Sequence, residues 1–596
     1  MKSFFKYLLA TVVGMLIVSM VMFFIMLGSL GAMMAGKSKS PVQVKDNTVL
    51  KIALDKEISD KSRSASGGGF ASFSMPDFSK TMGLNDMLKA IGKAKDDARI
   101  KGIYLTYEGG SAGFATTQEL RRALASFKES GKFVYAYADS YTQNAYHLAS
   151  VADSVFIQPQ ASVSFQGMAV QVMFFTKFLE KIGVQMQVIR HGQFKSAVEP
   201  FMRTDMSAAN RLQYLVLFNS MWDVVSKDVA ASRNLSLERV NAIADSLLGF
   251  TARSALRAGL VDALMPGSQV EEKMLPERLG LADSVKVNMV SLGDYIKTVS
   301  EPKTSSKNKI AVIYAEGDIV VGKGSAGHIG IDLVGQIEKV LKDKNVKALV
   351  LRVNSPGGSV LTSDIIYQEM LKVKEKMPVV ASYGNYAASG GYYISCMAHK
   401  IYASPNTLTG SIGVFGTIPN LKGLVTDKLG LTVDRVQTNR NATAFTSAFR
   451  PLTAYEEAVI QQSIEEVYAG FIGKVAEGRH MTPAQVDSIG QGRVWSGTNA
   501  IGIGLVDELG GLEEAVAGAA EMAGISDYTL VEYPKDKSLS EQLMELLGDV
   551  QAKSAQAYIA RQFGVAGAEV YSQLSQLMGQ DKPQVWVRMP EILVFE

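Results

Sequence analysis

The sequence has a single cysteine, Cys396, in 596 residues, so an intramolecular disulfide framework is excluded. Cys396 lies among apolar residues, which is typical of a buried structural thiol rather than a nucleophile. There are five histidines and no metal-ligand cluster, so neither a metal nor another cofactor is predicted. The net charge is only +3 and no basic stripe occurs, so no nucleic-acid partner is predicted.

Charged residues make up 20% and apolar residues 47% of the chain, a balance typical of globular proteins. The length predicts two or more domains. Residues 7–36 carry no charge and could span a bilayer as a tilted helix. A cleaved signal peptide has a shorter apolar core, so residues 1–45 are predicted to form an uncleaved N-terminal membrane anchor, with cleavage as the alternative. Lysines lie on both sides of this run, and the positive-inside rule therefore leaves the membrane side open.

A diverged internal duplication is the most informative feature present. The segment Val379–Pro405 reappears 246 residues earlier as Phe133–Pro159. The later copy has Ser389-Gly390-Gly391 where the earlier one has Gln143-Asn144-Ala145. Chemistry is therefore expected at the serine of one half, and a different role at the glutamine of the other.

The same order of elements recurs around both copies: an apolar strand, an amphipathic helix, a buried strand and a Gly-rich turn. Such repeated strand–helix units predict an α/β fold with parallel sheets covered by helices. The predicted division is an anchor (1–45), a first domain (46–294), a polar linker (295–308), a second domain (309–536) and a helical and extended tail (537–596). Within the tail, Val585–Phe595 is expected to be extended, as an edge strand or an oligomer contact.

The surroundings of Ser389 suggest a nucleophile. A predicted strand, Val379–Ser382, leads through a tight segment to a helix that should begin near Ser389, where free N–H groups and the positive end of the helix dipole are located. Gly390 leaves room for a substrate carbonyl, and Gly357 and Gly358 of a second turn could add N–H donors to an oxyanion hole. The alternative is that Ser389 is a helix N-cap and that its glycines only permit close packing.

A serine nucleophile needs a base. His399 corresponds to Asp153 of the first half, which predicts a solvent-facing turn, and His147 is interpreted as structural. Lys195 lies between small and apolar residues and could serve if burial lowers its pKa. The alternative is an ordinary surface amine.

The lysine and the serine are found in opposite halves. The counterpart of Lys195 in the second half is Asn441 or Ala442, neither of which is basic. Ser411, in the Gly-Ser-Ile-Gly segment after the next strand, could orient a neutral lysine amine, or it could be a turn serine.

Four segments together resemble the S49 family of serine–lysine peptidases, the signal peptide peptidases. They are NSPGGSV (Asn354–Val360), NYAASGGYYIS (Asn385–Ser395), TGSIGVFG (Thr409–Gly416) and GQFKSAVEPF (Gly192–Phe201). The resemblance covers essentially the whole chain. The duplicated halves and the N-terminal run are similar to the long, two-domain form of this family.

The resemblance implies duplicated domains of the crotonase and Clp-protease type, with repeated ββα units. By motif match it implies that Ser389 is the nucleophile, Lys195 the general base and Ser411 the residue that assists the lysine. It places Gly358 and Gly390 near the oxyanion donors.

The resemblance further implies a single-pass protein of the bacterial inner membrane, with its catalytic body on the periplasmic side. It would form a homo-oligomer, commonly a tetramer, and its substrates would be signal-peptide remnants and other apolar, unfolded peptides. The function expected is thus that of a serine endopeptidase. The alternatives are a non-catalytic membrane-tethered scaffold of the same fold and a crotonase-type acyl-CoA enzyme.

Overall fold

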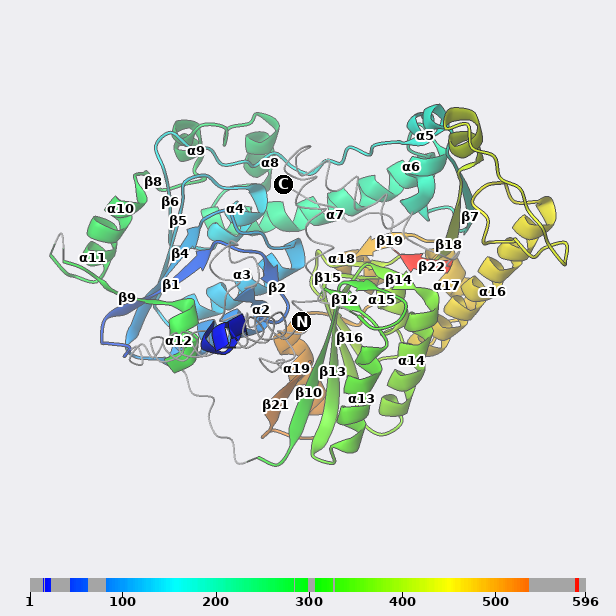
Figure 1. The fold of residues 1–596 in the computed structure, drawn as a ribbon. Helices are drawn as coiled ribbons and strands as arrows, with labels where there is room; N and C mark the ends of the chain where they lie inside the picture. Colours follow the sequence, from blue (N-terminus) through cyan, green and yellow to red (C-terminus); the bar gives the residue numbers. More distant parts are fainter. Residues whose placement is uncertain are drawn as a thin grey trace, which may run out of the picture.

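The computed structural model describes residues 14–15, 17–22, 43–62, 82–282, 285–298, 306–324, 327–534 and 585–588. The two halves of the chain form two helix-covered sheets, coloured blue to green and green to orange in Figure 1, and the long helix α7 (Ala208–Arg233) reaches from the first toward the second.

The first half forms a six-stranded sheet of order β8-β6-β5-β4-β1-β9, in which every neighbouring pair is parallel. Its strands are continuous apolar runs because helices bury both faces. The strands are β1 (Thr48–Leu54), β4 (Ile100–Tyr107), β5 (Phe133–Ala138), β6 (Ser154–Ile157), β8 (Ala263–Leu264) and β9 (Asn288–Ser291), and a separate pair joins β2 (Ile58–Ser59) to β3 (Met82–Gly83).

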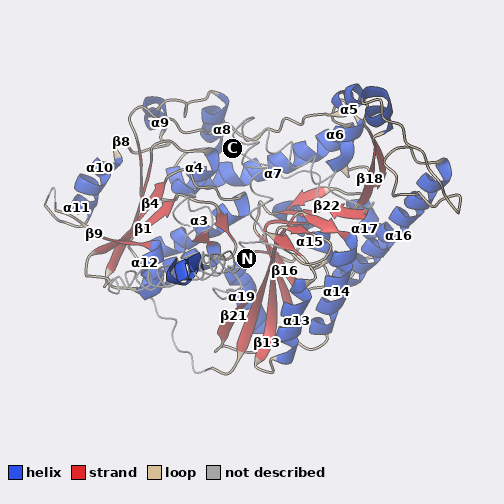
Figure 2. Cartoon of the chain, in the orientation of Figure 1, coloured by secondary structure: helices blue, strands red, loops and turns tan. Residues whose placement is uncertain are grey.

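The second half forms an eight-stranded sheet with the main order β19-β17-β15-β13-β10-β21. Helices α13 (Asp332–Lys342) and α14 (Val360–Lys374) cover one face and α19 (Leu512–Met522) covers the other, as Figure 2 shows. The strands are β10 (Lys309–Glu316), β13 (Val346–Ser355), β15 (Val379–Ala388), β16 (Lys400–Ala403), β17 (Leu408–Gly410), β19 (Val494–Ser496), β20 (Glu508–Leu509) and β21 (Thr529–Tyr533).

A third sheet combines strands from both halves and from the C-terminal segment. Its order is β12-β11-β14-β22-β18-β7. The strands are β7 (Gln185–His191), β11 (Asp318–Ile319), β12 (His328–Ile329), β14 (Gly357–Ser359), β18 (Val414–Asn420) and β22 (Val585–Arg588). The last strand is extended as predicted, but it lies between β14 and β18 and is therefore not an edge strand.

The helices repeat the duplication. Helices α3 and α14 have the same length and lie 246 residues apart, as do α7 and α16. The helices are α2 (Leu84–Asp96), α3 (Phe114–Lys128), α4 (Gln143–Ala149), α5 (Thr176–Ile182), α6 (Glu199–Met202), α7 (Ala208–Arg233), α8 (Leu237–Asp245), α9 (Ala252–Ala258), α10 (Gly267–Gln269), α11 (Leu275–Arg278), α12 (Leu292–Thr298), α13 (Asp332–Lys342), α14 (Val360–Lys374), α15 (Gly390–Tyr393), α16 (Ala454–Arg479), α17 (Pro483–Ile489), α18 (Gly497–Gly502) and α19 (Leu512–Met522).

The linker, the anchor and the tail differ in how far the structure describes them. Helix α12 extends into the segment 295–308 that was predicted to be a linker, because Leu292 and Tyr295 are buried together against the first half. Of the uncharged run 7–36 in the predicted anchor (1–45), the structure describes residues 14–15 and 17–22, which are helical, and the tail other than β22 lies outside the described residues. Among the residues that the structure does describe, no helix is both long enough and apolar enough to cross a bilayer.

Candidate active site

Ser389 lies at a sharp turn between the end of β15 and the short helix α15. Its backbone has φ 55° and ψ −113°, a conformation that a residue with a side chain rarely adopts. The turn is held by a hydrogen bond of 2.8 Å from the Ser389 N–H to the Gly410 carbonyl. Ser389 occupies the N-cap position of α15, but its side chain makes no capping hydrogen bond, so the hydroxyl does not serve as a helix cap. Strained backbone of this kind tends to cluster at functional sites.

Lys195 follows β7 and precedes the helical turn Ser196–Val198. It is fully buried, so the interpretation as a surface amine is also wrong. Its Nζ lies 2.9 Å from Ser389 Oγ, 3.0 Å from the Ser411 carbonyl oxygen and 3.0 Å from Ser411 Oγ. The structure therefore brings together, within one chain, the three side chains that the sequence singled out from its two halves.

The surroundings of the Lys195 amine favour its neutral form. Burial lowers the pKa of Lys195 well below its usual value, because removal from water disfavours the charged ammonium. A neutral amine has two N–H donors and one lone pair. It can donate to the carbonyl and hydroxyl oxygens of Ser411 while it accepts the Ser389 proton, which matches the three contacts at Nζ.

Ser411 also lies in a strained turn, with φ 51°. Its N–H donates to the Arg493 carbonyl oxygen at 2.7 Å. The Arg493 guanidinium in turn lies 4.0 Å from the Trp495 ring centre and 5.0 Å from that of Phe194, the residue before the lysine. These contacts fix the Ser411 turn against the Lys195 segment.

The segment 491–493 supports the lysine and was not identified from the sequence. The Phe194 N–H donates to the Gln491 carbonyl at 2.9 Å. A Cβ at Gly492 would lie 2.7 Å from Lys195 Cβ, and one at Gly413 would lie 3.2 Å from Lys195 Cδ. Only glycine leaves space for the lysine at these two points. The sequence sign of this support is the segment Gly490-Gln491-Gly492, but its composition is typical of an ordinary turn.

A hydrogen bond to the main chain also holds Lys195 in place. The Arg190 side chain donates to the Lys195 carbonyl at 2.9 Å. Arg190 Nη1 lies 3.8 Å from the fully buried carboxylate of Glu199. Glu199 accepts hydrogen bonds from the Ser207 N–H and the Asn210 amide at the start of α7. The lysine segment is thus tied to a long helix.

The predicted oxyanion glycines converge beside Ser389. A Cβ at Gly390 would lie 3.1 Å from both Gly357 Cα and Gly358 N, so Gly390 lies in close contact with β14. The Gly357 N–H already donates to Ser355 Oγ at 3.1 Å. The Gly390 N–H belongs to the first turn of α15, where N–H groups have no partner within the helix. The Gly390 N–H is therefore better placed than the Gly357 N–H to act as an oxyanion donor.

The other nucleophile and base candidates have different partners. His399 Nδ1 accepts the Val379 N–H at 3.0 Å, and His147 Nε2 lies 2.7 Å from an Asp228 carboxylate oxygen. A further histidine, His191, four residues before Lys195, stacks on Tyr468 with ring centres 3.7 Å apart. Burial raises the pKa of the Cys396 thiol to about 12, which keeps it protonated at neutral pH.

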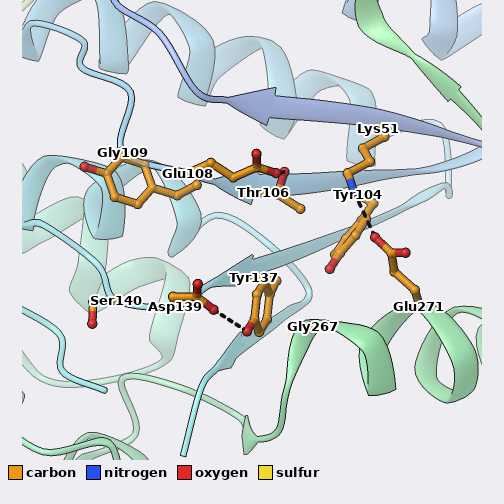
Figure 3. Close-up of a pocket in the computed structure, with 11 residues that line it drawn as sticks. Lys51, Tyr104, Thr106, Glu108, Gly109, Tyr137, Asp139, Ser140, Gly267 and Glu271 are labelled. Atoms are coloured by element: carbon orange, nitrogen blue, oxygen red, sulfur yellow. Dashed lines mark hydrogen bonds and ion pairs between the residues drawn. The ribbon is translucent and has the colours of Figure 1, made fainter. Parts of the chain in front are cut away.

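A cavity of about 540 Å³ lies elsewhere, in the first half (Figure 3). Its lining includes a Lys51–Glu271 ion pair of 2.9 Å and a Tyr137–Asp139 hydrogen bond of 2.7 Å. None of the predicted site residues lines it. Within the described part of the chain, no group of three or more histidine, cysteine or acidic residues is placed to hold a metal ion.

Comparison with known proteins places this geometry in a family. The sequence profile of peptidase family S49 matches residues 126–278 and 372–526, and the Clp protease profile matches residues 301–409. Protease 4 of Salmonella typhi is 38% identical over 80% of this chain and 78% of its own length, and Protease 4 of Haemophilus influenzae is 36% identical over 80% of each. The chloroplastic serine protease SPPA of Arabidopsis thaliana is 31% identical over 85% of this chain and 74% of its own.

The chain therefore belongs to peptidase family S49, in its two-domain form, and is a serine protease with a Clp-protease-like α/β fold.

Proposed function

We propose that the protein hydrolyses peptide bonds through a Ser389–Lys195 dyad. The observation that carries this proposal is the fully buried Lys195 amine, 2.9 Å from Ser389 Oγ. Neutral Lys195 takes the Ser389 proton as Oγ attacks the substrate carbonyl carbon. The lysinium then protonates the leaving amine, and the acyl group stays on Ser389 as an ester. Water, deprotonated by the same lysine, hydrolyses the ester and restores the serine.

The negative charge that develops on the carbonyl oxygen needs backbone donors. We assign this role to the N–H groups of Gly358 in β14 and of Gly390 at the start of α15, since the two residues lie against one another. Removing one such donor typically costs about 3 kcal/mol of transition-state stabilisation. Ser411 acts by orienting the lysine amine, so its loss should slow the reaction less than loss of either dyad residue.

The substrates in this proposal are apolar, unfolded peptides, in particular signal-peptide remnants. The uncharged run 7–36 supports a membrane anchor that holds the catalytic body close to peptides in the bilayer. The family relationship supports a single-pass protein of the bacterial inner membrane, with its body on the periplasmic side and assembled as a homotetramer. The domain division 46–294 and 309–536, with a linker at 295–308, belongs to the same proposal.

The dyad is tested by peptide hydrolysis and by covalent labelling with a serine-directed probe. Ser389→Ala and Lys195→Ala should each lower kcat/KM by at least about 10⁴-fold, since removing one residue of a catalytic unit removes most of its effect. Ser411→Ala should give an intermediate loss. Mass spectrometry should find the label on Ser389 and not in the Lys195→Ala variant.

Gln143→Ala, at the position in the first half that corresponds to Ser389, is the matched control and should keep near wild-type activity. Hydrolysis at the wild-type rate by either dyad variant, or a label on another residue, would refute the assignment. A folded wild-type protein without hydrolysis would instead favour the scaffold, and coenzyme A binding would favour the acyl-CoA enzyme.

A further inference from the structure

The segment that brings Lys195 to Ser389 lies against a buried tyrosine of the second half. Tyr468 is on α16, which packs beside β7 (Figure 1). Its ring stacks on the imidazole of His191, with ring centres 3.7 Å apart. Because His191 is the last residue of β7, this contact fixes one end of the short segment that leads from the strand to the lysine.

The hydroxyl of the same tyrosine holds the other end of the segment through Gln491. It accepts the Gln491 N–H at 3.1 Å and donates to a carboxylate oxygen of Asp487, on α17, at 2.7 Å. The Gln491 side-chain amide donates to the same carboxylate oxygen at 2.5 Å. The Gln491 carbonyl then accepts the N–H of Phe194, the residue before Lys195, at 2.9 Å. Tyr468 therefore supports the lysine segment at both ends.

Gln491 needs this support because its backbone conformation is unfavourable. Its φ is 54°, in the left-handed region that a residue with a side chain seldom adopts. The hydrogen bonds of its N–H and of its side chain offset this strain. Without the tyrosine hydroxyl, Gln491 can relax and withdraw its carbonyl from the Phe194 N–H. The lysine segment would then lose a main-chain contact directly before Lys195.

The first half has the same pair of positions with different chemistry. The counterparts of Tyr468 and Asp487 are Trp222 and Asn241, each 246 residues earlier. The Trp222 indole N–H donates to the Asn241 side-chain oxygen at 2.8 Å, so the contact between the two helices is kept. An indole N–H only donates, whereas a tyrosine hydroxyl donates and accepts at once. The half that holds Ser389 therefore has the residue that can also accept a main-chain N–H.

We propose that Tyr468, oriented by Asp487, is a positioning residue for the general base Lys195. It acts on the lysine through His191 at one end of the segment and through Gln491 at the other. The proposal rests on the proposed function, because it takes Lys195 as the base. It makes the two helices α16 and α17 part of the machinery that sets the position of the amine.

A change at Tyr468 should be visible at the Lys195 amine. The amine is fully buried, and its described polar contacts are with oxygens of Ser389 and Ser411. A segment that is free to move admits water to the amine. Water favours the charged ammonium, so the pKa of Lys195, which burial lowers, should rise toward its usual value.

The charged and titratable side chains that face this segment come from several surrounding elements. They are Arg190 of β7, Glu199 of α6, Arg493 beside Phe194, Asp487 of α17, and His191 with its partner Glu465 of α16. Tyr468→Phe removes one hydroxyl and keeps all of these side chains. A shift in the pH profile of that variant therefore reports on the amine.

The test compares Tyr468→Phe with Trp222→Phe, the matched control in the first half. Tyr468→Phe keeps the ring that stacks on His191 and removes only the hydroxyl. It should lower kcat by about tenfold to a hundredfold with KM unchanged, since a small displacement of a reacting group is enough for such a loss. The acid limb of its kcat/KM profile should also move to higher pH. Trp222→Phe should change neither quantity, in assays well below the unfolding temperature of each variant.

Asp487 offers a conservative variant that should restore activity. Asp487→Asn keeps an oxygen that can accept from Tyr468 and Gln491, and it introduces the residue type found at Asn241. It should keep a kcat near that of the wild type, whereas Asp487→Ala should lose as much as Tyr468→Phe. An unmoved pH profile in Tyr468→Phe, a change confined to KM, or equal losses in the two Asp487 variants would overturn the proposal.

A measurement that needs no hydrolysis separates this proposal from that of the dyad. Between pH 7.5 and 9.5, wild-type stability should rise with pH relative to Lys195→Met, because folding releases the lysine proton. With Tyr468→Phe in both proteins the rise should be smaller, since the folded-state pKa of Lys195 lies closer to its unfolded value. A smaller rise, in a wild type that hydrolyses no peptide, would support the positioning role and reject the reaction. An unchanged rise, with hydrolysis that requires Lys195, would do the reverse.

Discussion

The two halves of the molecule share the same hydrogen-bonded framework but differ in the residue at the position of Ser389. The hydroxyl of Tyr146 donates to the Leu260 carbonyl at 2.7 Å, and that of Tyr392 donates to the Leu505 carbonyl at 2.9 Å, so equivalent hydrogen bonds hold both copies. Three residues before each tyrosine the copies diverge, to Gln143 in one half and Ser389 in the other.

The Gln143 side chain holds the loop whose counterpart in the second half packs against Lys195. Its Oε1 accepts the N–H groups of Gln166 and Gly167 at 3.0 Å, and its Nε2 donates to the Gly167 carbonyl at 3.0 Å. The counterpart of Gly167 is Gly413, and there the Lys195 side chain enters instead. In the first half, Gln143 holds the loop at Gln166 and Gly167 by hydrogen bonds. In the second half, Gly413 leaves room for Lys195, which comes from the first half.

The halves are also electrostatically complementary. Arg352 of β13 is fully buried, and its guanidinium lies 2.7 Å from Asp60 and 2.6 Å from Glu119, two acids of the first half. The residue that corresponds to Arg352 in the first half is Thr106, which has no charge. The duplication has therefore diverged into a pair that fits together, both in this ion-pair cluster and at the contact between Lys195 and Ser389.

The largest effect on stability is expected from breaking this cluster. Arg352→Leu should lower the free energy of unfolding by about 3–5 kcal/mol, because it leaves two buried carboxylates without their cation. Chemical denaturation followed by circular dichroism measures the change. Thr106→Val is the matched control and should cost about 1 kcal/mol or less. A loss below about 1 kcal/mol for Arg352→Leu would mean that the halves do not depend on this contact.

A second prediction concerns the free energy that is needed to bury the Lys195 amine in the folded protein. The folded-state pKa of Lys195 is lowered, so folding must release its proton at any pH between that pKa and the unfolded value near 10.5. In this window wild-type stability should rise with pH, relative to Lys195→Met, by about 1.4 kcal/mol per pH unit. Thermal or denaturant unfolding between pH 7.5 and 9.5 measures the difference.

An exposed lysine provides the control for this pH dependence. The Lys342 side chain is 76% exposed, so its environment changes little on unfolding. Lys342→Met should follow the wild-type pH profile in parallel. If the stability of Lys195→Met also changes with pH in parallel with that of the wild type, then the Lys195 amine is charged in the folded protein and cannot serve as the base. The same neutral amine predicts that kcat/KM rises with pH through the Lys195 pKa, which lies below the usual value for lysine.

The comparison also shows what the sequence could reveal. Ser389, Lys195 and Ser411 were identifiable because each differs from its counterpart in the other half, and the residues do converge in the structure. The strand at 379–382 was predicted too short, since it continues to Ala388 and places the serine directly after its end. The support from Gln491 and Gly492 depends on a contact between distant segments, which no local pattern encodes. The position of β22 inside a sheet was missed for the same reason.

The smallest expected effect comes from removing the equivalent tyrosine hydroxyls, which tests whether the same hydrogen bond contributes equally to stability in the two halves. Tyr146 and Tyr392 are both fully buried, and each hydroxyl has a carbonyl partner. Tyr146→Phe and Tyr392→Phe should therefore each lower the free energy of unfolding by about 1 kcal/mol. The two losses should agree and should add in the double variant, because the sites share no partner. The two variants should differ in activity, with a lower kcat for Tyr392→Phe alone. Tyr392 lies in the helical turn that begins after Ser389, whereas Tyr146 lies in the first half, at α4. Equal losses of stability with a fall in kcat confined to Tyr392→Phe would show a common scaffold with chemistry in one copy, whereas equal falls in kcat would place both halves at the site.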